Sequence, residues 1–293
     1  MIKRSPKLAF LLLGAASLVV AWHPLRETFW LATHDEAYTH LLLIFPVVTG
    51  LICLEWRSLE SLATPSFRAG LALLCISLAV AGFVRWRIGL PPDERLTGNM
   101  LALVSWLVGS FVLCFGVRIS RALFFLLGFS FLAVPLPRFL VNELVAGLQQ
   151  GSAVAARCLF WIARVPVVQD GLLLSIPDLT VEIATECSSI RSSSMLLVTT
   201  MILAQLLLRA SWRKSLVILL AIPLSVAKNG LRIFTIAMLG TRVDPSYLTG
   251  RLHHQGGVVF FAIGLGGIFL ALWLLHRNER GFWPKTMANP SAS

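Results

Sequence analysis

Cys187 is a candidate nucleophile because of the residues and the helix start around it. It lies in Glu186-Cys-Ser-Ser-Ile-Arg191, just before a long apolar run that we expect to be a membrane helix. The thiolate is the reactive form of cysteine, and both a helix N-terminus and a nearby cation favour it. Arg191 is four residues further on and would share a helical face with Cys187. The alternative is a structural cysteine, or a disulfide with Cys158, which we expect to be packed in a core.

Asn229 and Arg232 are the next candidate residues. They lie three positions apart near the end of the seventh expected span, in Lys228-Asn-Gly-Leu-Arg232, and would share one face of a helix. An ionisable group inside a membrane helix is costly, which makes it a functional-site hypothesis by default. The alternative is a side chain that extends to the lipid headgroups, as is common near a helix end. We expect Lys228 to behave in that way.

His253 and His254 supply a third type of reactive group. They lie in Leu252-His-His-Gln-Gly-Gly257, before the last expected span. Histidine titrates near neutral pH, so it transfers protons or polarises a carbonyl. A cysteine with a histidine is the nucleophile-and-base arrangement of cysteine peptidases. The alternative for either histidine, taken alone, is an interfacial side chain without a role.

The elements that would position these residues are membrane helices. Only 13% of the 293 residues are charged, whereas about 25% is typical of soluble domains. The sequence predicts an all-α polytopic membrane protein with about eight transmembrane helices, in one integral membrane domain over residues 1–293 that ends in a short cytoplasmic tail at 280–293. The apolar runs begin near Leu8, Leu41, Ala69, Leu96, Ala122, Ser192, Leu216 and Val258.

The charged residues predict the orientation of the chain. The formal net charge is +11. Because no polar domain is present to carry a basic patch for nucleic acid, we assign the basic residues to lipid headgroups and orientation signals. Basic residues in short loops on the side of the N-terminus, such as Arg118 and Arg213, predict that both termini are cytoplasmic. Cys187, Arg232 and His253 then lie together at the exterior face.

The segment before Cys187 is predicted to lie outside the membrane. Residues 138–164 are apolar at helical spacing but also carry charged and amide side chains, which predicts an amphipathic helix on the outer surface. Asp170-Gly171 between apolar runs is a hairpin signal. Leu179, Val181 and Ile183 recur at every second position, which is the period of a strand. A small β-hairpin-like element is therefore expected to lead to Cys187.

The order of these motifs resembles the exosortase/archaeosortase family over residues 135–261. The family pattern has a Pro-x-Pro element, a β-like approach, Cys-Ser-Gly-x-Arg, Asn-x-x-Arg, and His-x-x-x-Gly before the last span. The chain reads Cys187-Ser-Ser-Ile-Arg191, Asn229-Gly-Leu-Arg232 and His253-His-Gln-Gly-Gly257. Tyr38-Thr-His40 is similar to the family's Tyr-Ser-His near the second span.

Two departures from the family pattern affect the expected site. Ser189 stands where the family has glycine, which bears on how closely a substrate backbone approaches. The tandem His253-His254 leaves two histidines for one role, and Gly257, four residues after His253, favours His253.

The resemblance implies an inner-membrane cysteine protease or transpeptidase with its active site on the exterior face. Its partners would be exported proteins that end in a C-terminal sorting signal, which is a short motif, a hydrophobic helix and a basic tail. Cys187 would form an acyl thioester with the cleaved protein and pass the new C-terminus to an acceptor. Arg232 would donate hydrogen bonds to the oxyanion or to the leaving group, and His253 would shuttle a proton or act as a second donor. Supporting roles would fall to Arg191, Asn229, His254 and His40, with no metal, organic cofactor or nucleic acid.

Two functions from other classes are the alternatives. One is a non-catalytic membrane component of exopolysaccharide assembly, which would keep its function without the thiol of Cys187. The other is a small-solute or lipid transporter, with Arg232 as an anchor for the solute or lipid. A transporter would favour matched broken helices in two halves, and Pro46 and Pro223 do not lie in matching contexts.

Overall fold

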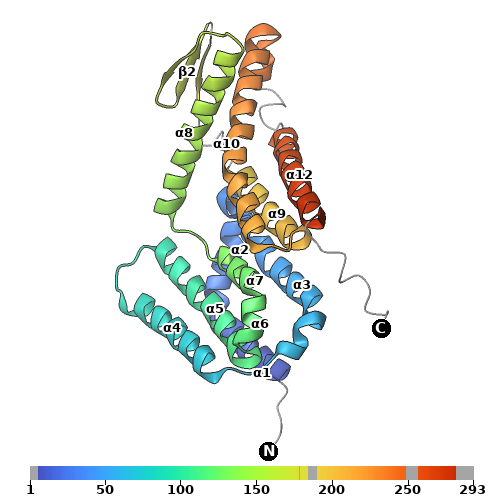
Figure 1. The fold of residues 1–293 in the computed structure, drawn as a ribbon. Coiled ribbons are helices and arrows are strands. Elements are labelled where there is room, and N and C mark those ends of the chain that lie inside the picture. Colours follow the sequence, from blue (N-terminus) through green and yellow to red (C-terminus); the bar gives the residue numbers. More distant parts are fainter. Residues whose placement is uncertain (1–5, 178, 184–189, 249–256, 282–293) are drawn as a thin grey trace, which may run out of the picture. The chain divides into compact units, whose positions relative to one another are not determined.

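The computed structural model describes residues 6–177, 179–183, 190–248 and 257–281 of the chain (Figure 1). These residues are mostly helical and include one small sheet. The chain divides into two compact units, Met1–Asn142 and Glu143–Ser293, and each has its own buried core. The prediction of one membrane domain, with its motifs between residues 135 and 261, stays a prediction.

The first unit is a group of apolar helices around an aromatic core. Phe115 packs against Phe10 and Trp56, with ring centroids 5.4 Å and 4.8 Å apart. Two of the helices, α4 and α5, approach closely because Gly70 faces the backbone of Leu113, where a Cβ atom would have no room. The elements are α1 (Pro6–Val20), α2 (Trp22–His34), η1 (Glu36–Tyr38), α3 (Leu41–Leu59), η2 (Glu60–Leu62), α4 (Phe67–Trp86), α5 (Pro92–Phe115), α6 (Val117–Ala122), α7 (Phe124–Phe129) and η3 (Ser130–Ala133).

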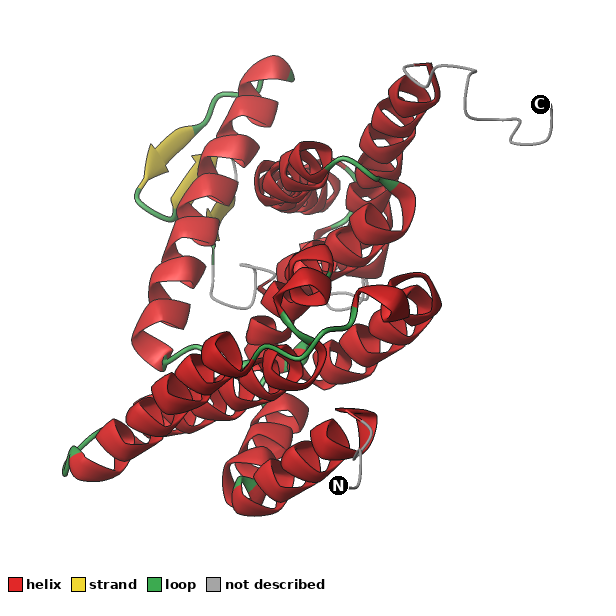
Figure 2. Ribbon diagram, turned by 60° about the horizontal axis from the view of Figure 1, so that its bottom comes forward, coloured by secondary structure: helices red, strands yellow, loops and turns green. Residues whose placement is uncertain are grey.

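The second unit combines long helices with the sheet. The sheet lies beside α8, and α10 packs against both α9 and α12 (Figures 1 and 2). The elements are α8 (Arg138–Ile162), which begins before the boundary of the unit, β1 (Val168–Asp170), β2 (Leu173–Ile176), β3 (Leu179–Glu182), α9 (Ile190–Leu207), α10 (Ser211–Arg242), η5 (Pro245–Leu248) and α12 (Gly257–Gly281).

The three strands form an antiparallel sheet in the order β1-β2-β3. The turn between β1 and β2 is Gly171-Leu172, and Gly171 has φ +59°, a conformation that glycine adopts without steric cost. Leu174 of β2 and Ile183, which directly follows β3, are buried in one core with Phe160 of α8 and Ile233 of α10. Strands therefore flank Asp170-Gly171, as the sequence predicts, and a third strand follows them.

The helices fit the prediction of a membrane protein. Six are long and apolar enough to cross a membrane, and two bent pairs pass the same test together. The pairs are α1 with α2, bent by 72°, and Phe124–Ala133 with α8, bent by 102°. The six helices are Glu36–Leu62, Phe67–Trp86, Pro92–Phe115, Ile190–Leu207, Ser211–Arg242 and Gly257–Arg277. The described residues therefore hold six candidate spans, or up to eight if each bent pair is one span.

The bend before α8 contains two prolines. Pro135 and Pro137 lack the amide hydrogens that a continuous helix would need, so the chain turns between η3 and α8. The bent pair that contains α8 fits a broken span or a re-entrant loop, and an amphipathic surface helix at 138–164 stays a prediction.

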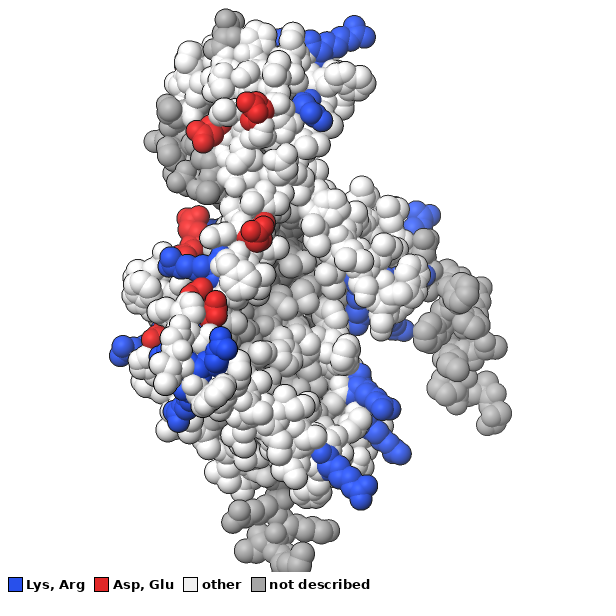
Figure 3. Space-filling view, turned by 90° about the vertical axis from the view of Figure 1, so that its left-hand side faces the viewer, with Lys and Arg blue, Asp and Glu red and all other residues white. Residues whose placement is uncertain are grey.

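Much of the protein surface is apolar. Large side chains such as Leu11, Trp86 and Trp273 are more than half exposed. Most of the face in Figure 3 carries no charge, and the Lys, Arg, Asp and Glu side chains gather in a few groups. Such a surface is unfavourable in water and suits contact with lipid.

Candidate functional site

The structure describes four of the seven residues that the sequence nominates. Arg191, Asn229 and Arg232 belong to the second unit, and His40 belongs to the first. Cys187, His253 and His254 lie outside the described residues.

Arg232 lies on α10 and lines a cavity between that helix and β3. The cavity has a volume of about 240 Å³, and its walls include Asn229, Arg232 and Leu248 together with Leu179–Glu182. Arg232 is partly buried. The helix continues for ten residues beyond it, to Arg242, so the prediction that Arg232 ends its helix is wrong. The intervening residues include no proline that would stop the helix earlier.

Asn229 joins α10 to α8. Its side-chain amide donates a hydrogen bond of 2.9 Å to the hydroxyl of Ser152, and that hydroxyl donates to the carbonyl of Leu148 at 2.6 Å. Asn229 and Ser152 are both buried. Ser152 was not predicted from the sequence, since a single serine in an apolar helix carries no signal of its partner. Asn229 therefore fixes the face of α10 that carries Arg232.

Gly230 allows the close approach of α8 and α10. A Cβ atom at this position would lie 2.5 Å from the Cβ of Ala155 and 2.9 Å from the backbone nitrogen of Ala156. Small residues at the crossing of two membrane helices permit such contact. Within Asn229-Gly-Leu-Arg232, Asn229 supplies a hydrogen bond to α8 and Gly230 permits the close contact with α8. Arg232 lines the cavity.

We expect Gly230→Ala to destabilise the second unit, by about 1–3 kcal/mol, because the added methyl group overpacks the helix crossing. Thermal unfolding of the purified protein in detergent would show the loss. Gly147→Ala is the matched control on α8, because a Cβ atom there meets nothing within 4 Å. Equal stability of the two variants would contradict the close contact at Gly230.

Lys228 is buried, contrary to the prediction that it extends to the headgroups. Its side chain is only 4% exposed, and its Nζ lies 2.5 Å from the hydroxyl of Ser192 on α9. A Cβ atom at Gly264 of α12 would lie 3.0 Å from its Cδ. The sequence could not show this burial, because it depends on how α9 and α12 pack around α10.

Arg191 stands in the first turn of α9, which begins at Ile190, three residues after Cys187. Its side chain is exposed, and its carbonyl accepts a hydrogen bond of 3.0 Å from the hydroxyl of Ser194. Cys158 is an exposed, free cysteine. The interpretation of Cys158 as core packing is therefore wrong.

His40 and Tyr38 belong to the first unit. Tyr38 is buried, and its hydroxyl donates a hydrogen bond of 2.8 Å to the carbonyl of Leu136, which lies between the two prolines of the Pro-x-Pro element. His40 precedes α3, and its buried Nδ1 has no hydrogen-bond partner among the described residues. Tyr38, the first residue of the sequence similar to Tyr-Ser-His, therefore joins that motif to the Pro-x-Pro element.

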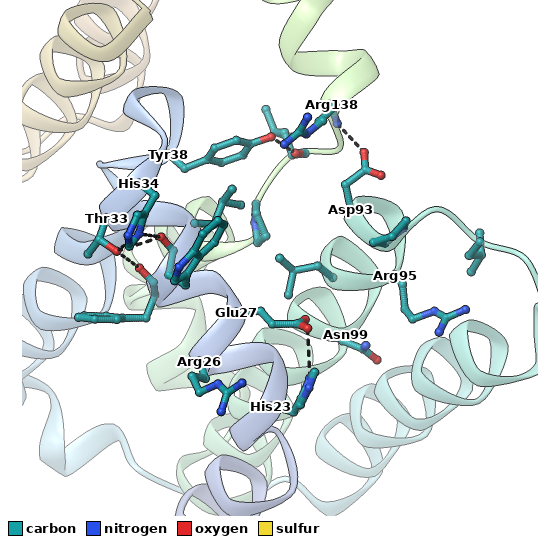
Figure 4. A pocket seen from close by; sticks show the side chains of 18 residues that line it. His23, Arg26, Glu27, Thr33, His34, Tyr38, Asp93, Arg95, Asn99 and Arg138 are labelled. Carbon is teal, nitrogen blue, oxygen red and sulfur yellow. Dashed lines mark hydrogen bonds and ion pairs between the residues drawn. The ribbon is translucent and has the colours of Figure 1, made fainter.

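A larger cavity of about 1200 Å³ lies beside Tyr38 (Figure 4). Asp93 accepts a hydrogen bond of 2.8 Å from the backbone N–H of Arg138, which fixes the start of α8. Glu27 lies 3.4 Å from His23 at the lower end of the view. The cavity does not include His40 among its lining residues. It combines charged and aromatic side chains at the segments that we expect on the exterior face.

The helices and the apolar surface define a multi-pass membrane protein. The chain belongs to the transmembrane exosortase family, because the family model described as Transmembrane exosortase (Exosortase_EpsH) matches residues 30–270. This match confirms the resemblance seen in the sequence motifs. No match was found among the curated proteins or among the solved structures.

Proposed function

We propose that this protein is a cysteine transpeptidase that cleaves C-terminal sorting signals from exported proteins. Membership of the exosortase family supports this proposal. The observation that carries it is the position of Arg232 and Asn229 in one cavity with β3, since the chain from β3 leads directly to Cys187. The substrates would be exported proteins that end in a short motif, a hydrophobic helix and a basic tail.

The proposed reaction has two steps. The thiolate of Cys187 attacks the scissile carbonyl, the C–N bond breaks, and the amine of the released segment takes up a proton. The new C-terminus is then an acyl thioester on Cys187. A nucleophile of the acceptor attacks the thioester, and the thiolate leaves. Arg232 donates hydrogen bonds to the oxyanion formed in each step.

The membrane would contribute by holding the substrate. A substrate anchored by its own hydrophobic helix presents its scissile bond at a fixed depth, which reduces the entropy that the reaction must overcome. We place the site at the exterior face of the inner membrane, since the short inner loops are basic. In protein that also carries Cys158→Ala and Cys187→Ala, a cysteine introduced at Asp170 should react with an impermeant thiol reagent while the inner membrane is intact. Reaction only after permeabilisation of that membrane would reverse the proposed orientation.

The experiment that tests the proposed function is a processing assay. An epitope-tagged exported protein from the same genome, ending in the motif, helix and basic tail, would be expressed with and without this chain. We expect the tagged protein to lose its C-terminal segment only when this chain is present. A length that does not change between the two strains would contradict the proposal.

The two histidines should differ in their importance for processing. We expect His254→Ala to be mild and His253→Ala to be damaging, because His253 has the family-like spacing to Gly257. If His253 shuttles protons, His253→Arg is inactive and the wild-type rate titrates near pH 6–7. If His253 is a charged donor, His253→Arg keeps measurable activity. Processing at matched membrane abundance decides between them, and an inactive His254→Ala beside an active His253→Ala would exchange the two assignments.

A further inference from the structure

The strand β3 forms one edge of the sheet. The strand order β1-β2-β3 leaves it paired on one side with β2, and the structure describes no strand on its other side. An open strand edge presents unpaired N–H and C=O groups that can bind another extended chain.

The pairing with β2 shows which backbone groups face the open edge. The N–H of Ile183 donates to the carbonyl of Leu172 at 3.0 Å, so Ile183 belongs to a hydrogen-bonded pair. Hydrogen-bonded and non-hydrogen-bonded pairs alternate along an antiparallel ladder. In the register of β2 with β3, Val181 therefore bonds to β2, whereas the backbone groups of Thr180 and Glu182 point away from it.

This open edge borders the cavity that contains Arg232. All four residues of β3 line the cavity of about 240 Å³, and α10 forms the opposite wall. Arg232, Asn229 and Glu182 make one part of the lining polar. Outside β3, the rest of the lining is apolar and comes from Ile233, Ile236, Ala237 and Leu248. An α-helix with side chains is about 10 Å wide, so a cavity of this volume suits a short extended segment.

We infer that the substrate's sorting motif binds as an added strand along the open edge of β3, between that strand and α10. This inference rests on the proposed function and adds the binding mode of the substrate. Backbone hydrogen bonds to Thr180 and Glu182 hold the segment extended. The wall of α10 selects small apolar side chains beside Ile236 and Ala237, and polar groups beside Arg232.

The position of Cys187 in the chain fits this binding mode. Glu182, the last residue of β3, precedes Cys187 by five residues. Five extended residues span at most about 17 Å. A motif bound along β3 therefore presents its scissile bond within a short distance of the thiol, and Arg232 lines the same cavity.

The test removes the outward N–H of β3 without breaking the ladder. Proline has no amide hydrogen and is tolerated on an edge strand, so Thr180→Pro removes a backbone donor of the proposed site, together with the hydroxyl that lies 3.2 Å from the hydroxyl of Ser175. We expect processing of the tagged exported protein to fall by about tenfold or more, at matched membrane abundance. Gln169→Pro is the matched control, because Asp170 and Leu173 close the two-residue turn and the N–H of Gln169 faces the opposite edge of the sheet. We expect its processing to change less than about twofold.

Cross-linking gives a second measurement that does not depend on the proline variants folding. A photoreactive amino acid at position 180, in protein that also carries Cys187→Ala, should cross-link to the motif of the tagged protein. The same amino acid at position 169 should not. Cross-links at both positions or at neither would overturn the inference, as would wild-type processing by Thr180→Pro. In these cases the proposed function still stands if the wild-type protein processes the substrate, and it fails only if the wild type does not.

Discussion

Cys187→Ala should abolish processing of the tagged exported protein while the variant protein stays in the membrane at wild-type abundance. The thiolate is the attacking group of the proposed first step, and alanine has no nucleophile to replace it. Cys187→Ser should be inactive as well, because a serine hydroxyl is a weak nucleophile without a base adjusted to it. Immunoblotting of the substrate and of the variant, from the same membranes, measures both quantities.

Cys158→Ala is the matched control for this experiment. Cys158 is exposed and free in the structure, so its loss should leave processing unchanged. Full processing by Cys187→Ala would remove Cys187 as the nucleophile. An essential disulfide between Cys158 and Cys187 in active protein would have the same consequence.

Arg232→Lys should be nearly as damaging as Arg232→Ala. The planar guanidinium offers several donors in a fixed arrangement, which a lysine ammonium does not reproduce. Loss of an oxyanion donor costs about 100-fold or more in rate, so we expect a loss of that size from both variants. Initial rates of substrate processing, at saturating and limiting substrate expression, would measure it.

Arg242→Lys is the control on the same helix. Arg242 is the exposed last residue of α10 and does not line the cavity, so the exchange should have little effect. If Arg232→Lys keeps full activity, Arg232 acts as a simple charge, such as an anchor for a lipid or for the substrate tail. The oxyanion role would then be wrong.

The local signals in the sequence identified much of the second unit. Asp170-Gly171 predicted a turn because glycine adopts positive φ freely, and Gly171 has φ +59° between two strands. The alternation from Leu179 to Ile183 predicted a strand, because one face of the sheet packs on a core. These features are encoded by neighbouring residues, so no knowledge of distant contacts was needed.

The features that the sequence did not predict depend on contacts between distant residues. The burial of Lys228 requires Ser192 and Gly264, from two other helices. The bond from Asn229 to Ser152 spans 77 positions, and the one from Tyr38 to Leu136 spans 98. No periodic pattern reports such pairs. The continuation of α10 past Arg232 has no local signal either, because a charged residue can end an apolar helix or lie within it.

The covalent state of Cys187 during turnover tests the central claim most directly. Protein purified with the tagged substrate, and stopped rapidly in acid, would be digested and analysed by mass spectrometry. The proposed mechanism predicts that Cys187 carries the new C-terminal peptide of the substrate, and that neutral hydroxylamine releases it, as expected of a thioester. Substrate cleaved by the wild-type protein with the acyl group on another residue, or with no hydroxylamine-sensitive adduct under conditions that slow the acceptor step, would contradict it.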